Sequence, residues 1–159
     1  MKHIVPAAII LALALSAPLA ADEAAPADDP VSAWNADRTL PVDAGGLDLG
    51  AFQWIARPVV VFADSPNDPQ FIQQMELLAD RAEDLALRDV VVVVDTDPAA
   101  ASATRLNLRP RGFMLALVGK DGQIKARKPR PWDVRELSRS IDKMPLRQQE
   151  MQDRRGVSP

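Results

Sequence analysis

The chain has 159 residues, of which 47% are hydrophobic and 26% charged, and its net charge is −3, as expected for an ordinary globular protein of one domain. It contains no cysteine and no tyrosine, and its only histidine is His3. Beyond residue 3, this excludes thiol redox chemistry, Cys-His and Ser-His-Asp catalysis, and zinc or haem sites built on cysteine or histidine. We expect no catalytic residue, no metal and no cofactor, and the composition favours a protein that is not an enzyme.

Residues 1–21 have the pattern of a secretory signal peptide, with Lys2 near the start, an apolar run from Ile4 to Leu15 and small residues around Ala20. A membrane anchor is the alternative, but it needs about 20 apolar residues, and this run is shorter and is followed by acids. We therefore expect an exported protein, periplasmic or secreted if the source is bacterial, with no stable membrane span after the signal is removed.

Three further segments are expected after the signal. Residues 22–46 are acidic and rich in alanine and proline, which predicts a flexible leader with Val31 and Trp34 as candidate points of attachment. The globular domain is expected at residues 47–151, and a polar tail at residues 152–159.

Four apolar or alternating runs predict strands at Val59–Ala63, Val90–Val94, Phe113–Val118 and Gln123–Arg127. The Asp-Gly pair at residues 121–122 predicts a hairpin between the last two strands.

Helices are predicted where apolar residues recur at helical spacing behind an N-cap residue. One runs from Pro69 to about Leu87 behind Asp68, a short one runs from Pro98 to about Leu106, and the last follows a capping box at Asp133 and Glu136 and stops before Pro145. The order strand, helix, strand, helix, strand, strand, helix predicts an α/β fold: a thioredoxin-like mixed sheet with helices on both faces, since helical crossovers join parallel strands and a hairpin adds antiparallel neighbours.

Four segments carry a family resemblance: "WIARPVVVFADSPNDPQFIQQMELL", "LALRDVVVVV", "LVGKDGQIKAR" and "IDKMPLRQQEM". They resemble the thioredoxin- or peroxiredoxin-like domain of unknown function found in bacterial envelope proteins, which is related to the P-DUDES domain of vertebrate sushi-repeat-containing matrix proteins. The resemblance covers about Leu47 to Met151, and its most specific parts are residues 117–122 and the closing Met144, Pro145, Arg147, Glu150 and Met151. The function of that family is itself largely unassigned, so the resemblance implies a fold rather than an activity.

A turn follows the first predicted strand, where thioredoxin-like redox enzymes carry their reactive cysteine because the free N–H groups of a helix N-terminus favour a thiolate. This chain has Ser65 between acids instead, and a hydroxyl cannot replace a thiol in redox chemistry. The cis-proline of thioredoxins is also missing from its usual position, since Gly112 precedes the third strand. We call the residues of this turn the site-equivalent turn: Asp64, Ser65, Asn67 and Asp68.

Acids near this turn leave two readings open. Two neighbouring strands are followed by oxygen ligands that calcium would accept: Asp64, Asp68, Asp95 and Asp97. Their spacing matches no calcium-binding loop, and Asp68 is more simply a helix cap because Pro69 follows it. A glycosidase-type pair of carboxylates also stays open, since a sequence does not give the distances between acids.

The segment "KARKPRPW" predicts a basic, partly aromatic surface for an anionic partner such as an acidic envelope protein, an anionic glycan or a lipid head group. The alternative is a solvated loop that balances charge, with the acidic leader as one source of that charge. Nucleic acid is not expected as a partner of an exported protein with a net charge of −3. The candidate binding residues are Lys125, Arg127, Lys128, Arg130, Arg111 and Trp132.

Two classes of function follow. The first is an exported, non-catalytic thioredoxin-like binding or interaction module of the cell envelope, and the lack of cysteine favours it. The second is a redox-related enzyme accessory or a peroxiredoxin-like protein that has lost its activity.

Overall fold

The structure is a computed structural model that describes residues 29–156. The expected signal peptide at residues 1–21, the first part of the expected leader at residues 22–28 and the end of the expected tail at residues 157–159 lie outside the described residues.

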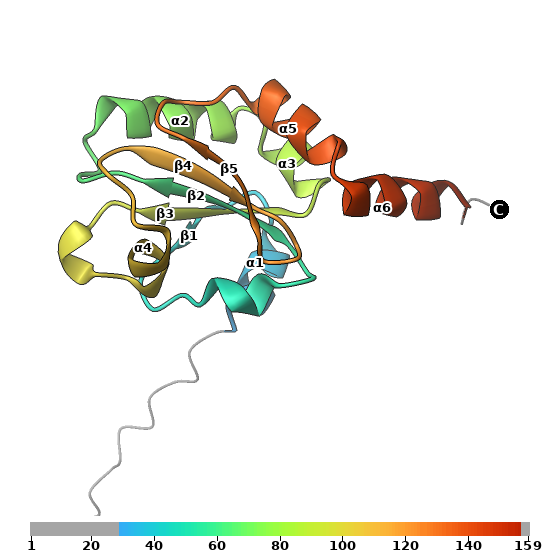
Figure 1. Cartoon of the computed structure of the whole chain (residues 1–159), viewed down its shortest axis with the longest axis horizontal. Helices are drawn as coiled ribbons and strands as arrows, with labels where there is room; N and C mark the ends of the chain where they lie inside the picture. The colour runs from blue at the N-terminus through green and yellow to red at the C-terminus, as the bar shows by residue number, and fades with distance from the viewer. Residues whose placement is uncertain (1–28, 157–159) are drawn as a thin grey trace, which may run out of the picture.

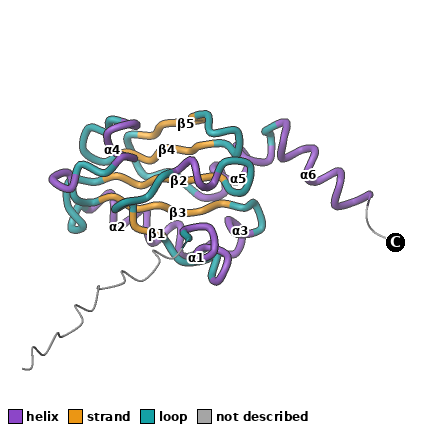
Figure 2. The backbone as a smooth tube through the Cα atoms, turned by 90° about the horizontal axis from the view of Figure 1, so that it is seen from below, coloured by secondary structure: helices purple, strands orange, loops and turns teal. Residues whose placement is uncertain are grey.

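The centre of the fold is a sheet with the strand order β1-β3-β2-β4-β5 (Figure 2). Strands β1, β3 and β2 are parallel to one another, whereas β4 runs antiparallel to β2 and β5 antiparallel to β4. The predicted thioredoxin-like mixed sheet is thus confirmed. The strands are β1 (Val42–Asp43), β2 (Arg57–Phe62), β3 (Val90–Asp95), β4 (Met114–Val118) and β5 (Ile124–Lys128).

Helices cover both faces of this sheet (Figure 1). One face carries α2 (Pro69–Ala79), α3 (Ala82–Ala86) and α5 (Val134–Asp142), and the other carries α1 (Pro30–Ala36), the 3-10 turn η1 (Leu49–Phe52) and α4 (Ala103–Leu108). The central strands have continuous apolar runs because alternate residues enter the two cores. Val59 and Val61 pack with Leu137 and Ile141, whereas Val60 and Phe62 pack with Trp34 and Phe52.

The helix predicted from Pro69 to Leu87 is two helices, α2 and α3, which are separated at Asp80 and Arg81. The short helix predicted from Pro98 is likewise divided into the 3-10 turn η2 (Pro98–Ala100) and α4, because Ala101 adopts a left-handed conformation with φ of 46°. The capping role of Asp68 is confirmed, since its carboxylate accepts hydrogen bonds from the N–H groups of residues 70 and 71.

The folded domain starts earlier and ends later than expected. Residues 30–46 were expected in a flexible leader, but Pro30 begins α1, and Trp34 in that helix is 1% exposed. The Trp34 ring packs edge-on against Phe52, with 6.1 Å between the ring centroids. At the other end, Pro145 takes the first position of α6 (Pro145–Gly156), where proline is favoured, so residues 152–156 are helical rather than a tail.

We predict that Trp34→Ala lowers the free energy of unfolding by about 3–5 kcal/mol, because it leaves a cavity in a closely packed core. Urea unfolding measures this, and Leu40→Ala, at a side chain that is 60% exposed, is the control that should change stability by less than about 0.5 kcal/mol. If Trp34→Ala unfolded like the parent protein, the N-terminal helix would not belong to the cooperative domain.

Candidate functional site

The site-equivalent turn lies at the carboxyl end of β2 and is held by its own hydrogen bonds. The Ser65 hydroxyl accepts a hydrogen bond from the backbone N–H of Asn67 at 3.2 Å, and the Asp68 carboxylate accepts one from the N–H of Gln70 at 2.7 Å. Residues 29–156 contain no histidine that could activate Ser65 as a nucleophile. The turn therefore has the geometry of a helix start and lacks the base that a nucleophilic serine needs.

A buried ion pair lies directly behind this turn. Arg105 of α4 reaches Asp95 at the end of β3 with 2.7 Å between Nη2 and Oδ1, and Ser102 donates to the same carboxylate at 2.5 Å. Arg105 also donates to the carbonyl oxygen of Ala63 at 2.8 Å. These contacts link the ends of β2 and β3 to α4. Both carboxylate oxygens of Asp95 accept hydrogen bonds in them.

The alternative of a calcium site is not supported by this arrangement. Asp95 is paired with Arg105, while Asp68 and Asp97 accept hydrogen bonds from the first N–H groups of their helices. Within residues 29–156, no three His, Cys, Asp or Glu side chains come together as a metal site would require.

The candidate binding residues divide between two ends of β5. Leu115 pairs with Lys128, so the end of β5 lies beside the start of β4 and the loop that precedes it. Arg127 donates to the carbonyl oxygen of Leu108, which links β5 to that same loop. We call the cations gathered there the basic corner: Arg109, Arg111, Arg127, Lys128 and Arg130.

Lys125 and Trp132 do not belong to the basic corner. Lys125 lies at the hairpin end of β5, where its ammonium is 2.5 Å from Asp121. Trp132 was expected on the surface but is 7% exposed, because its backbone N–H and C=O bond the side chain of Gln74 at 2.7 and 3.2 Å and its ring enters the core. The Lys128 ammonium covers this ring at 4.7 Å from the centroid.

The cations of the basic corner are not paired with acids in the described part of the chain. Its four arginines are exposed, and none of the ion pairs found between residues 29 and 156 involves a member of the corner. Its charges therefore face solvent at the edge of the sheet.

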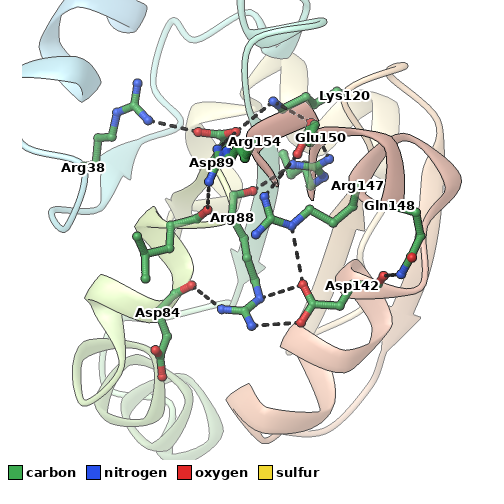
Figure 3. Close-up of polar contacts among 12 residues, drawn as sticks. Arg38, Asp84, Arg88, Asp89, Lys120, Asp142, Arg147, Gln148, Glu150 and Arg154 are labelled. Atoms are coloured by element: carbon green, nitrogen blue, oxygen red, sulfur yellow. Dashed lines mark hydrogen bonds and ion pairs between the residues drawn. The ribbon is translucent and has the colours of Figure 1, made fainter. Parts of the chain in front are cut away.

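Paired charges collect instead at the opposite end of the sheet (Figure 3). Arg57, the first residue of β2, is 1% exposed, and it donates to Glu150 of α6 and to the carbonyl oxygen of Arg88, both at 2.8 Å. Lys120 of the hairpin lies 2.9 Å from both Glu150 and Asp89. This ion-pair network joins the two central strands, the hairpin and the last helix.

The network extends outward through further arginines. Arg88 binds Asp142 with two hydrogen bonds of 3.0 and 2.8 Å, and Arg147 lies 3.2 Å from Glu150. The members of the ion-pair network are Arg38, Arg57, Arg88, Asp89, Lys120, Asp142, Arg147, Glu150 and Arg154. Sequence reasoning missed it because its members come from separate segments; the charged Arg57 directly before a buried strand was the available signal.

Burial alone would raise the pKa of Glu150. The hydrogen bonds and charges of Arg57 and Lys120 outweigh that effect and lower the pKa of Glu150 from 4.5 to about 2. Glu150 is thus held as a carboxylate by two cations that themselves lie mostly inside the protein.

A groove of about 360 Å³ opens beside the network. Trp54 stands at its rim with 64% of its surface exposed and with a left-handed backbone, φ 66°. The N–H of Trp54 donates to the carbonyl oxygen of Lys120 at 2.7 Å, which fixes this strained residue against the hairpin. The residues that line this Trp54 groove are Trp54, Arg57, Gly119, Lys120, Asp121, Lys125, Met144, Pro145 and Leu146.

The strand order and the turn after β2 define a thioredoxin-like domain whose sequence contains no cysteine. The chain belongs to the family described as Domain of unknown function (DUF4174), which matches residues 48–150. Among residues 29–156, no helix has the length and apolar character needed to cross a bilayer.

Two of the known proteins that are similar to this chain illustrate the likeness. Coiled-coil domain-containing protein 80 of Danio rerio is 32% identical over 133 residues, which cover 65% of this chain but only 15% of that protein. The mitochondrial 2-Cys peroxiredoxin of Plasmodium falciparum is similar in structure, with a TM-score of 0.45 and 16% identity, over 60% of this chain and 79% of that one.

We predict that Glu150→Gln lowers the free energy of unfolding by about 3 kcal/mol near neutral pH, because it leaves buried cations without their carboxylate. Since the folded pKa of Glu150 is about 2 and its ordinary value is 4.5, the parent loses this stabilisation as the pH falls from 4.5 toward 2, and the two proteins should converge in that window. Urea unfolding at several pH values measures both effects.

The matched control is Asp153→Asn, an exposed acid on the same helix, which should change stability by less than about 0.5 kcal/mol. A constant difference between the parent and Glu150→Gln from neutral pH to acid would show that the charge of Glu150 does not stabilise the fold.

Proposed function

We propose that this protein is an exported, non-catalytic binding module of the cell envelope, and that the basic corner holds an anionic partner. The observation that carries the proposal is the set of exposed arginines that form no ion pairs within the described chain. Charged surfaces of one sign attract partners of the opposite sign and speed their association.

The second support for the proposal is the absence of a reactive cysteine at the site-equivalent turn. Ser65 stands in the place of the cysteine, and the acids around it serve as helix caps or as the partner of Arg105. A thioredoxin-like scaffold that has lost its thiol keeps its surfaces, which are then its means of function. The resemblance to envelope and P-DUDES domains that we expect from residues 117–122 and 144–151 favours the same proposal.

The partner class is an acidic envelope protein, an anionic glycan or an anionic lipid surface. All three present the carboxylate, sulfate or phosphate groups that arginine binds in a planar, two-point geometry.

Export is proposed from the pattern of residues 1–21, and it gives a direct prediction. Protein recovered from the envelope or medium of an expressing bacterium should begin near Asp22, because the small residues at Ala20 and Ala21 suit signal peptidase. Intact-mass measurement of the recovered protein locates the cleavage. Full-length protein found only inside the cell would contradict export.

We predict that reversing three charges of the basic corner, Arg109→Glu, Arg111→Glu and Arg130→Glu together, abolishes binding to anionic probes. The probes are heparin, polyglutamate and vesicles containing phosphatidylglycerol, each measured at about 0.05 and 0.5 M salt. The parent should bind at least one probe, and more weakly at high salt, because screening reduces attraction between exposed charges.

The control is a second triple variant, Arg135→Glu, Arg139→Glu and Lys143→Glu, which changes the net charge equally on the exposed side of α5. This control should keep most of the binding. Equal loss in both variants would mean that net charge rather than the basic corner attracts the probe, and no binding by the parent would remove this surface as the site.

A further inference from the structure

We propose that the partner of the basic corner is an extended acidic segment of another protein, which joins the sheet as a new strand beside β5. This inference rests on the binding role proposed for the basic corner and specifies which of the anionic partners the structure fits.

The free edge of the sheet is the first observation. β5 is the outer strand on its side of the sheet and pairs with β4 alone (Figure 2). Among residues 29–156, no backbone group outside the β4–β5 ladder bonds the backbone of Ile124–Lys128. Alternate residues of an edge strand direct both their N–H and their C=O away from the sheet, so β5 offers hydrogen-bonding groups to a further strand. The opposite edge of the sheet is β1, which has only two residues.

Cations on both faces of this edge are the second observation. Arg127 lies on the face of α4, where its guanidinium donates to the carbonyl oxygen of Leu108. Lys128 lies on the other face, where its ammonium covers the ring of Trp132. Successive side chains of a strand point to opposite faces of the sheet. Two successive acids of an added strand would therefore each meet one cation.

The charge of the basic corner is not cancelled by the acids around it. Three acids lie near it: Asp64 is beside Gly112, Asp133 caps α5, and Glu136 accepts the indole N–H of Trp132. None of the three forms an ion pair with the corner in the part of the chain that the structure describes. The five cations of the corner thus exceed these acids, and the excess favours an acidic occupant.

The backbone edge favours a peptide over the other anionic partners. An extended peptide presents N–H and C=O groups at the spacing of β5, and its side chains add the charges. A sulfated glycan or a lipid head group can use the cations but has no such repeating pattern of donors and acceptors. A second copy of this chain fits poorly, because β5 contains three cations and no acid, and like charges on paired strands repel.

The test uses the purified protein and the capped peptide acetyl-Thr-Glu-Glu-Val-Thr-Val-Thr-amide, with a dye for anisotropy, at about 0.05 M salt. One matched peptide has the same sequence with methylated backbone nitrogens at its five central residues, which removes strand pairing but keeps the charge. Another replaces both Glu residues by Gln. We expect the parent peptide to bind and each replacement to weaken binding about tenfold.

Hydrogen exchange and variants locate the site. On peptide binding, amide exchange should slow for at least one residue within 124–128, because new backbone hydrogen bonds form there. Lys128→Gln should weaken binding about threefold. The control is Lys125→Gln, which makes the same charge change on the same strand, at a side chain already bound to Asp121, and should leave binding nearly unchanged.

The outcomes separate this inference from the binding role of the basic corner. Equal binding of the methylated peptide, or unchanged exchange in β5, would overturn strand addition and leave the corner as a purely electrostatic site. Binding of heparin or vesicles without binding of the peptide would do the same. Failure of every anionic probe would remove both proposals. Slow exchange of the β5 amides in the protein alone, increasing with its concentration, would overturn the acidic partner in favour of a second copy.

Discussion

The burial of one charge, that of Arg57, constrains much of this structure. A guanidinium that is 1% exposed costs several kcal/mol unless it is paired, and its acidic partner, Glu150, lies 93 residues further along the chain. The charge at the start of the central strand is therefore compensated only when the last helix has docked. This ties the first half of α6 to the domain, although the surface of this helix is mostly polar and gives it little apolar area to bury, and its end projects outward (Figure 1).

Lys120 extends that constraint to the hairpin and to the loop before β2. Its ammonium is shared by Asp89 and Glu150, so the hairpin cannot move without breaking two ion pairs. Its carbonyl oxygen holds Trp54, whose left-handed backbone would not persist in an isolated loop. The groove thus depends on the same interaction that fixes the last helix, and its shape follows from the charges behind it.

The strands could be predicted from the sequence because a run of valines between turn residues is typical of a buried strand and of little else. The division between α2 and α3 could not, since the apolar spacing from Phe71 to Leu85 continues through the break. The prediction that Trp132 lies on the surface was wrong for a related reason. A tryptophan among prolines and cations suggests an exposed segment, whereas its burial depends on hydrogen bonds with the side chain of Gln74, 58 residues away. The Trp54 groove was unpredictable because its walls come from three distant segments.

The two ends of the sheet differ in whether their cations are paired with acids. At the network end, cations are matched by acids brought from elsewhere in the chain, whereas the cations of the basic corner form no ion pairs among the described residues. Acids are not scarce, because the sequence has 22 of them against 19 basic residues.

The acids are instead unevenly distributed along the sequence. Residues 29–102 carry thirteen acids and four basic residues, whereas residues 103–156 carry six acids and fourteen basic residues. The second segment forms β4, β5, α4, α5 and α6. Some of its cations, such as Lys120 and Arg147, belong to the ion-pair network, whereas those of the basic corner lie at the other end of β5, the outer strand of the sheet. Like charges held together lower the stability of a compact fold. The unpaired arginines of the basic corner therefore add nothing evident to the stability of the fold, which is consistent with the proposal that they serve association, and they are separate from the paired charges that hold the domain together.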